Sequence, residues 1–135
     1  MSLQIFLLCA KFSFPLFAVS KVASFFANWK GRRTVVVSRG PEPLLLAKAG
    51  CDSPLLFPVP ALDTPLLDSV GCGDALAGAF LALFIRTGNP EKAVQAGIVA
   101  AAEIARSPGC DPPIKTMEEL QVERNETMDS TTVKK

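Results

Sequence analysis

The sequence contains no histidine, and this absence removes a large part of the usual catalytic chemistry. Without an imidazole there is no histidine general acid or base and no histidine-ligated metal. Any proton transfer must therefore use a carboxylate, a lysine or a cysteine.

Cysteine is also scarce, with four residues and no CxxC pair among them. This spacing argues against a zinc site or a redox motif, so we assign no metal-ligating residue. The even count permits two disulfides, but few cysteines in a chain with a sizeable core suit a reducing compartment better. We expect a cytoplasmic protein, with the nucleus left open as a second compartment.

A strong charge of either sign is missing as well, since the formal net charge is +1. This balance gives no electrostatic case for nucleic acid or an anionic membrane as a partner, and small molecules are the partners we expect. The hydrophobic fraction of 49% and the charged fraction of 20% are typical of a globular protein.

The N-terminal segment lacks the features of a targeting signal, although six of the nine phenylalanines lie within residues 1–28. The apolar run Ile5–Ala10 is short, no basic residue precedes it, and Lys11 ends it, so we do not expect a cleaved secretory signal. Lys11, Pro15 and Lys21 likewise interrupt any membrane span. Residues 1–17 are left as an apolar segment without an interpretation.

The first half of the chain predicts one helix and three short strands. A helix is expected over about 18–29, and the face predicted to be buried consists of Val19, Val22, Phe25 and Phe26. Residues 34–38 predict a strand buried on both faces, because they are β-branched and apolar. Residues 44–47 predict a returning strand, and residues 55–59, bounded by prolines, predict an edge strand.

The second half predicts two helices after a glycine turn. Residues 75–85 are apolar on every side, which predicts a buried helix. Asn89 and Pro90 are the N-cap and first position of a helix that reaches about Arg106, with a buried stripe formed by Val94, Ile98, Ala101 and Ala105. Residues 114–135 predict a polar tail. Strands followed by packed helices predict the α/β class.

The segment Asp68–Asp74 carries the clearest chemistry. Gly71 and Gly73 flank one residue directly before a helix, so consecutive backbone N–H groups can point into one concavity that suits a phosphate. Asp74 then lies beside the bound group, where it could accept a proton from a substrate hydroxyl. Neither a Walker A loop nor GxGxxG is present. The alternative is an ordinary tight turn in which the Asp caps the helix.

This segment resembles the Asp-Thr-x-Gly-Ala-Gly-Asp signature of the ribokinase-like, phosphofructokinase-B type kinases, and residues 75–81 are similar to its continuation. The flanks, which are Thr34–Pro43, Phe57–Val59, Gln95–Gly97 and Arg106–Cys110, resemble the adenosine kinases of that family. The similarity covers about residues 18–113. It implies the C-terminal portion of a three-layer α/β/α fold, without the N-terminal half and lid.

The resemblance implies a role for each matching residue. Asp74 is the base that deprotonates the acceptor hydroxyl, and the backbones of Gly71, Cys72 and Gly73 form the anion hole. The residues implied to lie near ATP are Ser38 and Gly40 at the phosphates, Asp68 and Ser69 at the turn, and Ala101 and Ala102 at the adenine. ATP is the phosphoryl donor and Mg²⁺ bridges its phosphates. The chain departs from the pattern where Ser69 replaces Thr and Cys72 replaces Ala.

Three functions remain open at this level. The first is phosphorylation of adenosine by ATP, giving ADP and AMP in purine salvage. The second is phosphorylation of another sugar, because the signature is shared across the family. The third is a truncated chain that binds nucleotide without catalysis. We expect the 135 residues alone to show no adenosine phosphorylation and to self-associate through an exposed sheet edge.

Overall fold

The computed structural model describes residues 4–9, 15–29, 31, 33–63, 65 and 69–107. The chain divides into two compact units, Met1–Ala61 and Leu62–Lys135, and each is described by itself. The domain boundaries predicted at residues 17 and 113 remain predictions.

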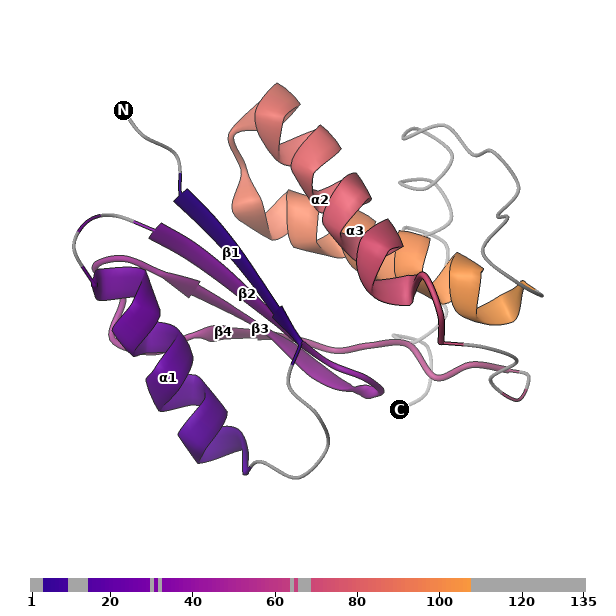
Figure 1. Ribbon diagram of the computed structural model, residues 1–135, viewed down its shortest axis with the longest axis horizontal. Coiled ribbons are helices and arrows are strands. Elements are labelled where there is room, and N and C mark those ends of the chain that lie inside the picture. The colour runs from indigo at the N-terminus through magenta and orange to yellow at the C-terminus, as the bar shows by residue number, and fades with distance from the viewer. Residues whose placement is uncertain are drawn as a thin grey trace, which may run out of the picture. The chain divides into compact units, whose positions relative to one another are not determined.

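The first unit is a four-stranded sheet with one helix on it (Figure 1). Its elements are β1 (Gln4–Cys9), α1 (Leu16–Asn28), β2 (Arg33–Arg39), β3 (Glu42–Lys48) and β4 (Leu55–Phe57). The strand order is β1-β2-β3-β4, with β1 parallel to β2 and the other neighbours antiparallel. The α1 helix is the crossover between the two parallel strands, as such a connection requires.

The centre of the sheet is apolar on both faces, as predicted for residues 34–38. Val35, Val36 and Val37 are all buried although neighbouring side chains of a strand point to opposite faces. A two-residue turn joins β2 to β3, and Arg39 pairs with Glu42 across it. Gly40 takes a φ of 63° in this turn, a conformation that glycine adopts without strain.

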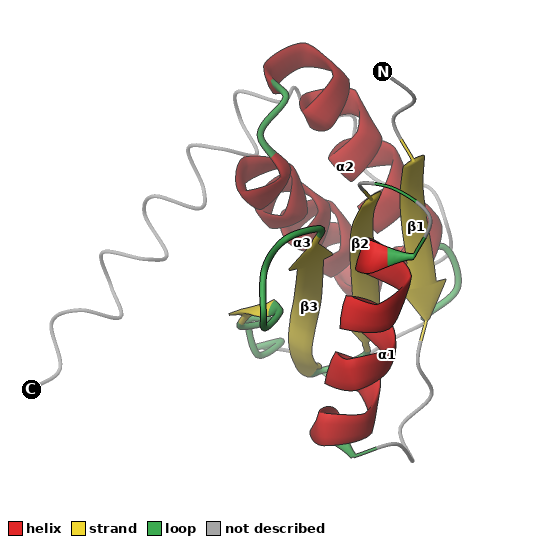
Figure 2. Ribbon diagram, turned by 90° about the vertical axis from the view of Figure 1, so that its left-hand side faces the viewer, coloured by secondary structure: helices red, strands yellow, loops and turns green. Residues whose placement is uncertain are grey.

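The α1 helix packs on the sheet through small residues, which corrects the predicted face. Figure 2 shows α1 lying along one face of the sheet. Val19, Ala23 and Ala27 share a buried cluster with Val35, Val37, Leu45 and Ala47 of the strands. Val22 and Phe25, predicted to be buried, are 50% and 60% exposed, and Phe26 is only partly buried. The spacing of four between the alanines lets the helix approach the sheet closely, and the larger side chains turn outward.

Two features of the sheet edges differ from the prediction. β1 falls in the segment left without an interpretation, because a short apolar run does not separate strand from helix by periodicity. β4 is an edge strand as predicted, but it spans three residues instead of five. Pro58 follows it directly, and proline cannot donate a ladder hydrogen bond.

The second unit contains a helical hairpin, α2 (Cys72–Thr87) and α3 (Pro90–Arg106). Gly88 links the helices in a left-handed conformation with φ 65°. The Asn89 side chain accepts a hydrogen bond of 2.9 Å from the Lys92 N–H, which confirms the predicted N-cap. A Cβ atom at Gly97 would lie 2.8 Å from the Leu76 carbonyl oxygen, so the two helices touch through backbone here.

The α2 helix is buried on one side only, which corrects the prediction of burial all round. Phe80 is fully buried and Leu83 and Phe84 nearly so, whereas Ile85 is 75% exposed. The helix also begins three residues earlier than predicted, since Cys72, Gly73 and Asp74 form its first turn. The apolar composition of residues 75–85 therefore did not reveal which side faces the core.

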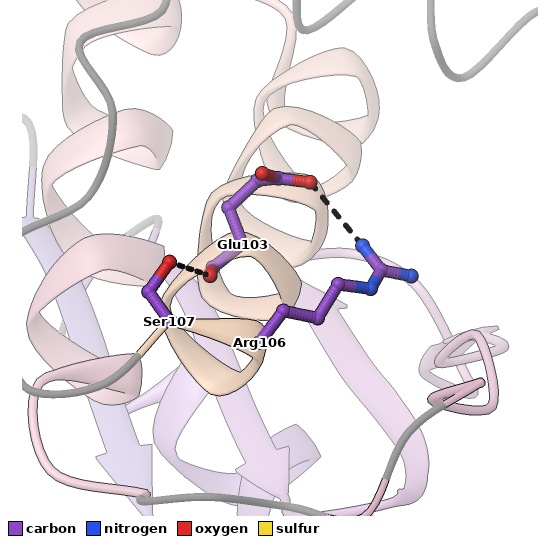
Figure 3. A network of polar contacts seen from close by, with 3 residues as sticks. All are labelled: Glu103, Arg106 and Ser107. Carbon is purple, nitrogen blue, oxygen red and sulfur yellow. Dashed lines mark hydrogen bonds and ion pairs between the residues drawn. The ribbon is translucent and has the colours of Figure 1, made fainter.

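The last turn of α3 is held by polar contacts (Figure 3). The Arg106 guanidinium lies 3.2 Å from the Glu103 carboxylate, and the Ser107 hydroxyl donates a 2.9 Å hydrogen bond to the Glu103 carbonyl. Ser107 also donates its N–H to the Ile104 carbonyl at 3.0 Å. These bonds satisfy carbonyl groups that a helix end leaves without partners. The predicted tail lies outside the described residues.

Candidate active site

The turn before α2 is shaped by Gly71. This residue is the N-cap of the helix and has a left-handed backbone, with φ 85° and ψ −12°. Its carbonyl accepts the N–H of Ala75 at 2.9 Å, which is the first hydrogen bond of the helix. A residue with a Cβ atom would be strained in this left-handed conformation, whereas glycine is not. Gly71 therefore sets the direction in which Ser69 and Val70 lead into α2.

The backbone N–H groups of the first turn form the anion-binding part of the candidate site. Ala75 is the first residue to donate within the helix, so the N–H groups of Gly73 and Asp74 precede the helical ladder. A Cβ atom placed at Gly73 would meet no heavy atom of the described residues within 4 Å, and a ligand can approach its backbone. The helix dipole adds a partial positive charge at this point.

One of the three backbones predicted for the anion hole is already engaged. The Cys72 N–H donates to the Ser69 carbonyl at 3.3 Å, closing the turn. The Gly73 N–H lies at the helix start as predicted, and the N–H of Asp74 is an additional donor that the sequence pattern did not single out. The general rule that the first N–H groups of every helix lack intrahelical partners could have identified the Asp74 N–H as a donor.

Asp74 is exposed at the third position of α2. The cap residue is Gly71 rather than Asp74, which lies in the first turn, where a carboxylate is also favoured by the helix dipole. Within the described ranges no ion pair or side-chain hydrogen bond is assigned to this carboxylate. The carboxylate and the N–H donors of the same turn are thus both open to a ligand.

The predicted adenine residues lie on α3 at the same end of the hairpin as the glycine turn. Gly97 touches Leu76, and the antiparallel course of the two helices brings the next turn of α3 towards the start of α2. Ala101 is half-buried and Ala102 is buried. Of the two, Ala101 therefore offers more surface to a ligand.

The remaining predicted residues are divided between the two units, and only Ser69 is described in the same turn as Asp74. Ser38 is half-buried in β2, opposite Cys9 in the register, and Gly40 is exposed in the β2–β3 turn, both in the first unit. Ser69 is exposed in the second unit, and Asp68 lies outside the described residues. The assignments of these residues to ATP remain predictions.

Neither a clustered metal site nor a membrane-spanning helix occurs in the part of the chain that the structure describes. These residues contain no group of three or more cysteine, aspartate or glutamate side chains placed to hold a metal ion. Across the same residues, no helix combines the length and the apolar character needed to cross a bilayer.

Comparison with known proteins identifies the family. Residues 18–117 match the pfkB family carbohydrate kinases. Adenosine kinase 2 of Arabidopsis thaliana is 32% identical over 85 residues, which cover 62% of this chain and 24% of that protein. The 2-dehydro-3-deoxygalactonokinase of Haloferax volcanii is 33% identical over 88 residues, covering 65% of this chain and 26% of that protein.

The same relationship is visible in three dimensions. The crystal structure of Anopheles gambiae adenosine kinase in complex with P1,P4-di(adenosine-5) tetraphosphate matches with a TM-score of 0.62 and 32% identity, covering 70% of this chain and 30% of that one. The predicted fold class, α/β and ribokinase-like, is thereby confirmed. This chain spans about a quarter of the length of the curated relatives it matches. It belongs to the pfkB family of carbohydrate kinases.

Proposed function

We propose that this chain forms the phosphate-handling part of an ATP-dependent kinase that phosphorylates a nucleoside hydroxyl, most like adenosine kinase. The observation that carries the proposal is the start of α2. There an exposed carboxylate and helix N-terminal N–H donors share one turn, and Gly71 in the left-handed conformation fixes that turn. This combination supplies a base and an oxyanion site together.

In the proposed reaction, Asp74 accepts the proton of the acceptor hydroxyl as its oxygen attacks the γ-phosphorus of ATP. The bond from that phosphorus to the β,γ-bridging oxygen breaks, and ADP leaves. The N–H groups at the start of α2 stabilise the charge on the transferring phosphoryl group. The Cys72 N–H joins Gly71 and Gly73 in this role only if its bond to Ser69 opens.

The nucleotide side of the proposal rests on the family pattern. Ser38 and Gly40 face the ATP phosphates, Asp68 and Ser69 anchor the turn, and Ala101 carries most of the contact with adenine. Mg²⁺ would arrive bound to the phosphates of ATP, where it would neutralise their charge, and we assign no residue of this chain to hold it. We further propose a cytoplasmic location for this purine salvage activity.

A second candidate acceptor is a sugar or sugar acid. The Haloferax volcanii kinase, whose name specifies such a substrate, matches this chain at 33% identity, about the same as the adenosine kinases. A shared phosphate turn serves either acceptor, because the turn contacts the phosphoryl group rather than the rest of the acceptor.

A segment exchange tests the proposal. Residues 69–107 replace the matching segment of Arabidopsis thaliana adenosine kinase 2, and turnover of adenosine is compared with and without Asp74→Asn. We expect the exchange to retain activity and Asp74→Asn to lower turnover about 10²–10⁴-fold, with ATP binding little changed. The control is an exposed carboxylate outside the turn of the exchanged enzyme, changed to the corresponding amide, which should leave turnover unaltered.

The outcomes separate the three functions left open by the sequence. Turnover within about threefold after Asp74→Asn would remove this residue from the role of base. Activity of the 135-residue chain on a sugar acid but not on adenosine would favour the second candidate. ATP binding without transfer to any acceptor identifies a nucleotide-binding chain, the result we expect for the 135 residues alone, since transfer requires the acceptor to be held in line.

A further inference from the structure

Gly97 lies against the main chain of α2 with no room for a side chain between them. A Cβ atom at this residue would lie 2.8 Å from the Leu76 carbonyl oxygen and 3.2 Å from Leu76 Cγ. Ordinary contact begins at 3.4 Å, so a methyl group here requires the two helices to separate by about 0.6 Å. The nearest obstacle is a backbone carbonyl, which does not rotate aside as the end of a flexible side chain can.

The backbone conformation of Gly97 does not itself call for glycine. The residue lies in the interior of α3 and its φ is not positive, unlike those of Gly71 and Gly88. Glycine in a helix interior is less favourable than alanine, because it loses more conformational freedom on folding. Glycine at this position therefore costs α3 some stability, and the close contact with Leu76 is what it makes possible.

This contact is near the candidate site on both helices. Leu76 follows Asp74 by two residues in α2, so its carbonyl moves together with the N–H donors of the first turn. Ala101 follows Gly97 by four residues, which is about one helical turn and therefore the same face of α3. The contact at Gly97 thus sets how far the phosphate-binding turn lies from Ala101.

The linked end of the hairpin offers no relief from a clash at Gly97. Two residues, Gly88 and Asn89, join the helices there. On that side of the contact, Phe80 of α2 and Val94 of α3 are both completely buried. Because a close-packed seam resists compression, a wedge at Gly97 turns the helices about their linked end. The end that opens is the one at which α2 begins and α3 ends.

Such an opening matters for a ligand that is held at two places. In the proposed function, ATP has its phosphates at the start of α2 and its adenine at Ala101. Binding at both places depends on their separation, whereas a phosphate chain without adenine depends on the turn alone. Misplacement by about 1 Å can cost on the order of 10²-fold in rate, which is the scale of the shift that a side chain at Gly97 imposes.

We propose that Gly97 is a positioning residue for the nucleotide. By letting the main chains of α2 and α3 touch, it fixes the distance between the N–H donors of the α2 turn and the adenine surface at Ala101. This role rests on the proposed function, because it takes ATP as the ligand of the turn. Gly97 itself does not touch the nucleotide and acts through Leu76.

Two ligands of the full chain separate this role from a general effect on stability. The 135-residue chain, labelled with ¹⁵N, is titrated with ATP and with inorganic tripolyphosphate, each with equimolar Mg²⁺. We expect both ligands to shift the amide signals of Gly73 and Asp74, and ATP alone to shift that of Ala101. The measured quantity is the ratio of the two dissociation constants, in which a loss of folded protein cancels.

The variant Gly97→Ala tests the contact with the smallest possible side chain. It should change the ratio about tenfold against ATP, while the affinity for tripolyphosphate changes less than about twofold. Gly78→Ala makes the same substitution in α2, where a Cβ atom meets no heavy atom of the described residues within 4 Å. Its ratio should equal that of the unaltered chain. Circular dichroism checks that both variants keep their helices.

The possible failures can be told apart. If neither ligand shifts the Gly73 and Asp74 amides, the proposed function is wrong at this turn and the role of Gly97 falls with it. If tripolyphosphate binds but ATP leaves Ala101 unmoved, or if Gly97→Ala keeps the ratio, the phosphate turn stands and the positioning role is overturned. Equal weakening of both ligands would make Gly97 a structural residue only. A Gly97→Ala chain that does not fold would show that the hairpin does not open, which also overturns the proposal.

Discussion

The helices α1 and α2 are similarly apolar, but α1 exposes most of its aromatic side chains and α2 buries them. In α1 the rings of Phe17 and Phe25 are exposed, whereas Ala23 and Ala27 face the sheet and only Phe26 packs partly against the buried cluster. In α2, Phe80 and Phe84 are buried and stack with ring centroids 5.4 Å apart. The partner surface decides between these arrangements.

The partner of α2 is α3, whose buried residues are mostly small, with four alanines and Gly97 among them. Bulk on one helix is thus matched by small residues on the other, as close packing requires. The partner of α1 is a sheet whose facing side chains are valine, leucine and alanine, and the alanines of α1 complete that layer. Apolar composition alone does not show which faces of the two helices are buried.

The largest effect that would sharpen this comparison is expected from Phe80→Ala. The side chain is completely buried, so its removal should lower the free energy of unfolding of the second unit by about 3–5 kcal/mol. Phe25→Ala in α1 should change stability by less than about 1 kcal/mol, because the ring is exposed. Native-state hydrogen exchange, read separately on the amides of α1 and α2, measures both effects. Equal protection losses in the two variants would contradict the comparison.

A smaller effect is expected where α2 and α3 touch through backbone. Gly97→Val places its Cβ atom 2.8 Å from the Leu76 carbonyl oxygen unless the helices shift, and should destabilise the hairpin by about 1–3 kcal/mol. Gly78→Ala is the control, since open space surrounds that position in the described part of α2. It should stabilise the helix by roughly 0.5–1 kcal/mol. Urea denaturation followed by circular dichroism distinguishes the opposite signs.

The smallest effect concerns a helix end in each unit. Asn89→Ala removes the cap of α3 and should cost about 1 kcal/mol. In the first unit, Asn28 accepts the Gly50 N–H at 3.0 Å and donates to the Ser24 carbonyl at 2.8 Å. Asn28→Ala should also cost about 1 kcal/mol. Exchange rates of the amides of Lys92 and Gly50 check each change, and an unaltered rate in the matching variant would count against the bond.

The sequence predicted the elements better than the faces they bury. The N-cap at Asn89, the β2 strand and the edge position of β4 follow from local chemistry, and the structure confirms them. β1 and the buried side of α1 depend on tertiary pairing. The parallel partner of β1 lies beyond a whole helix, and the alanines of α1 carry little hydrophobic signal by themselves.

The candidate site was predicted at the level of residue types rather than hydrogen bonds. The glycine turn and the carboxylate at Asp74 stand out in the sequence because glycine permits a left-handed backbone before a helix. The hydrogen bond from the Cys72 N–H to the Ser69 carbonyl could not be predicted from the sequence, since it depends on how tightly the turn closes. Whether Ser38 and Gly40 join Asp74 around one nucleotide remains a prediction.

The two-residue link through Gly88 and Asn89 has a consequence for the order of folding. Its contacts join residues close in sequence, so the hairpin closes at a small entropic cost, whereas the pairing of Gln4 with Arg33 must first organise the helix between them. Refolding should therefore form α2 and α3 before the parallel pair. During synthesis the order of appearance is reversed, because the first unit, which folds more slowly, leaves the ribosome before the hairpin. The nascent chain then carries β1, α1 and the antiparallel strands of the first unit ahead of any completed hairpin.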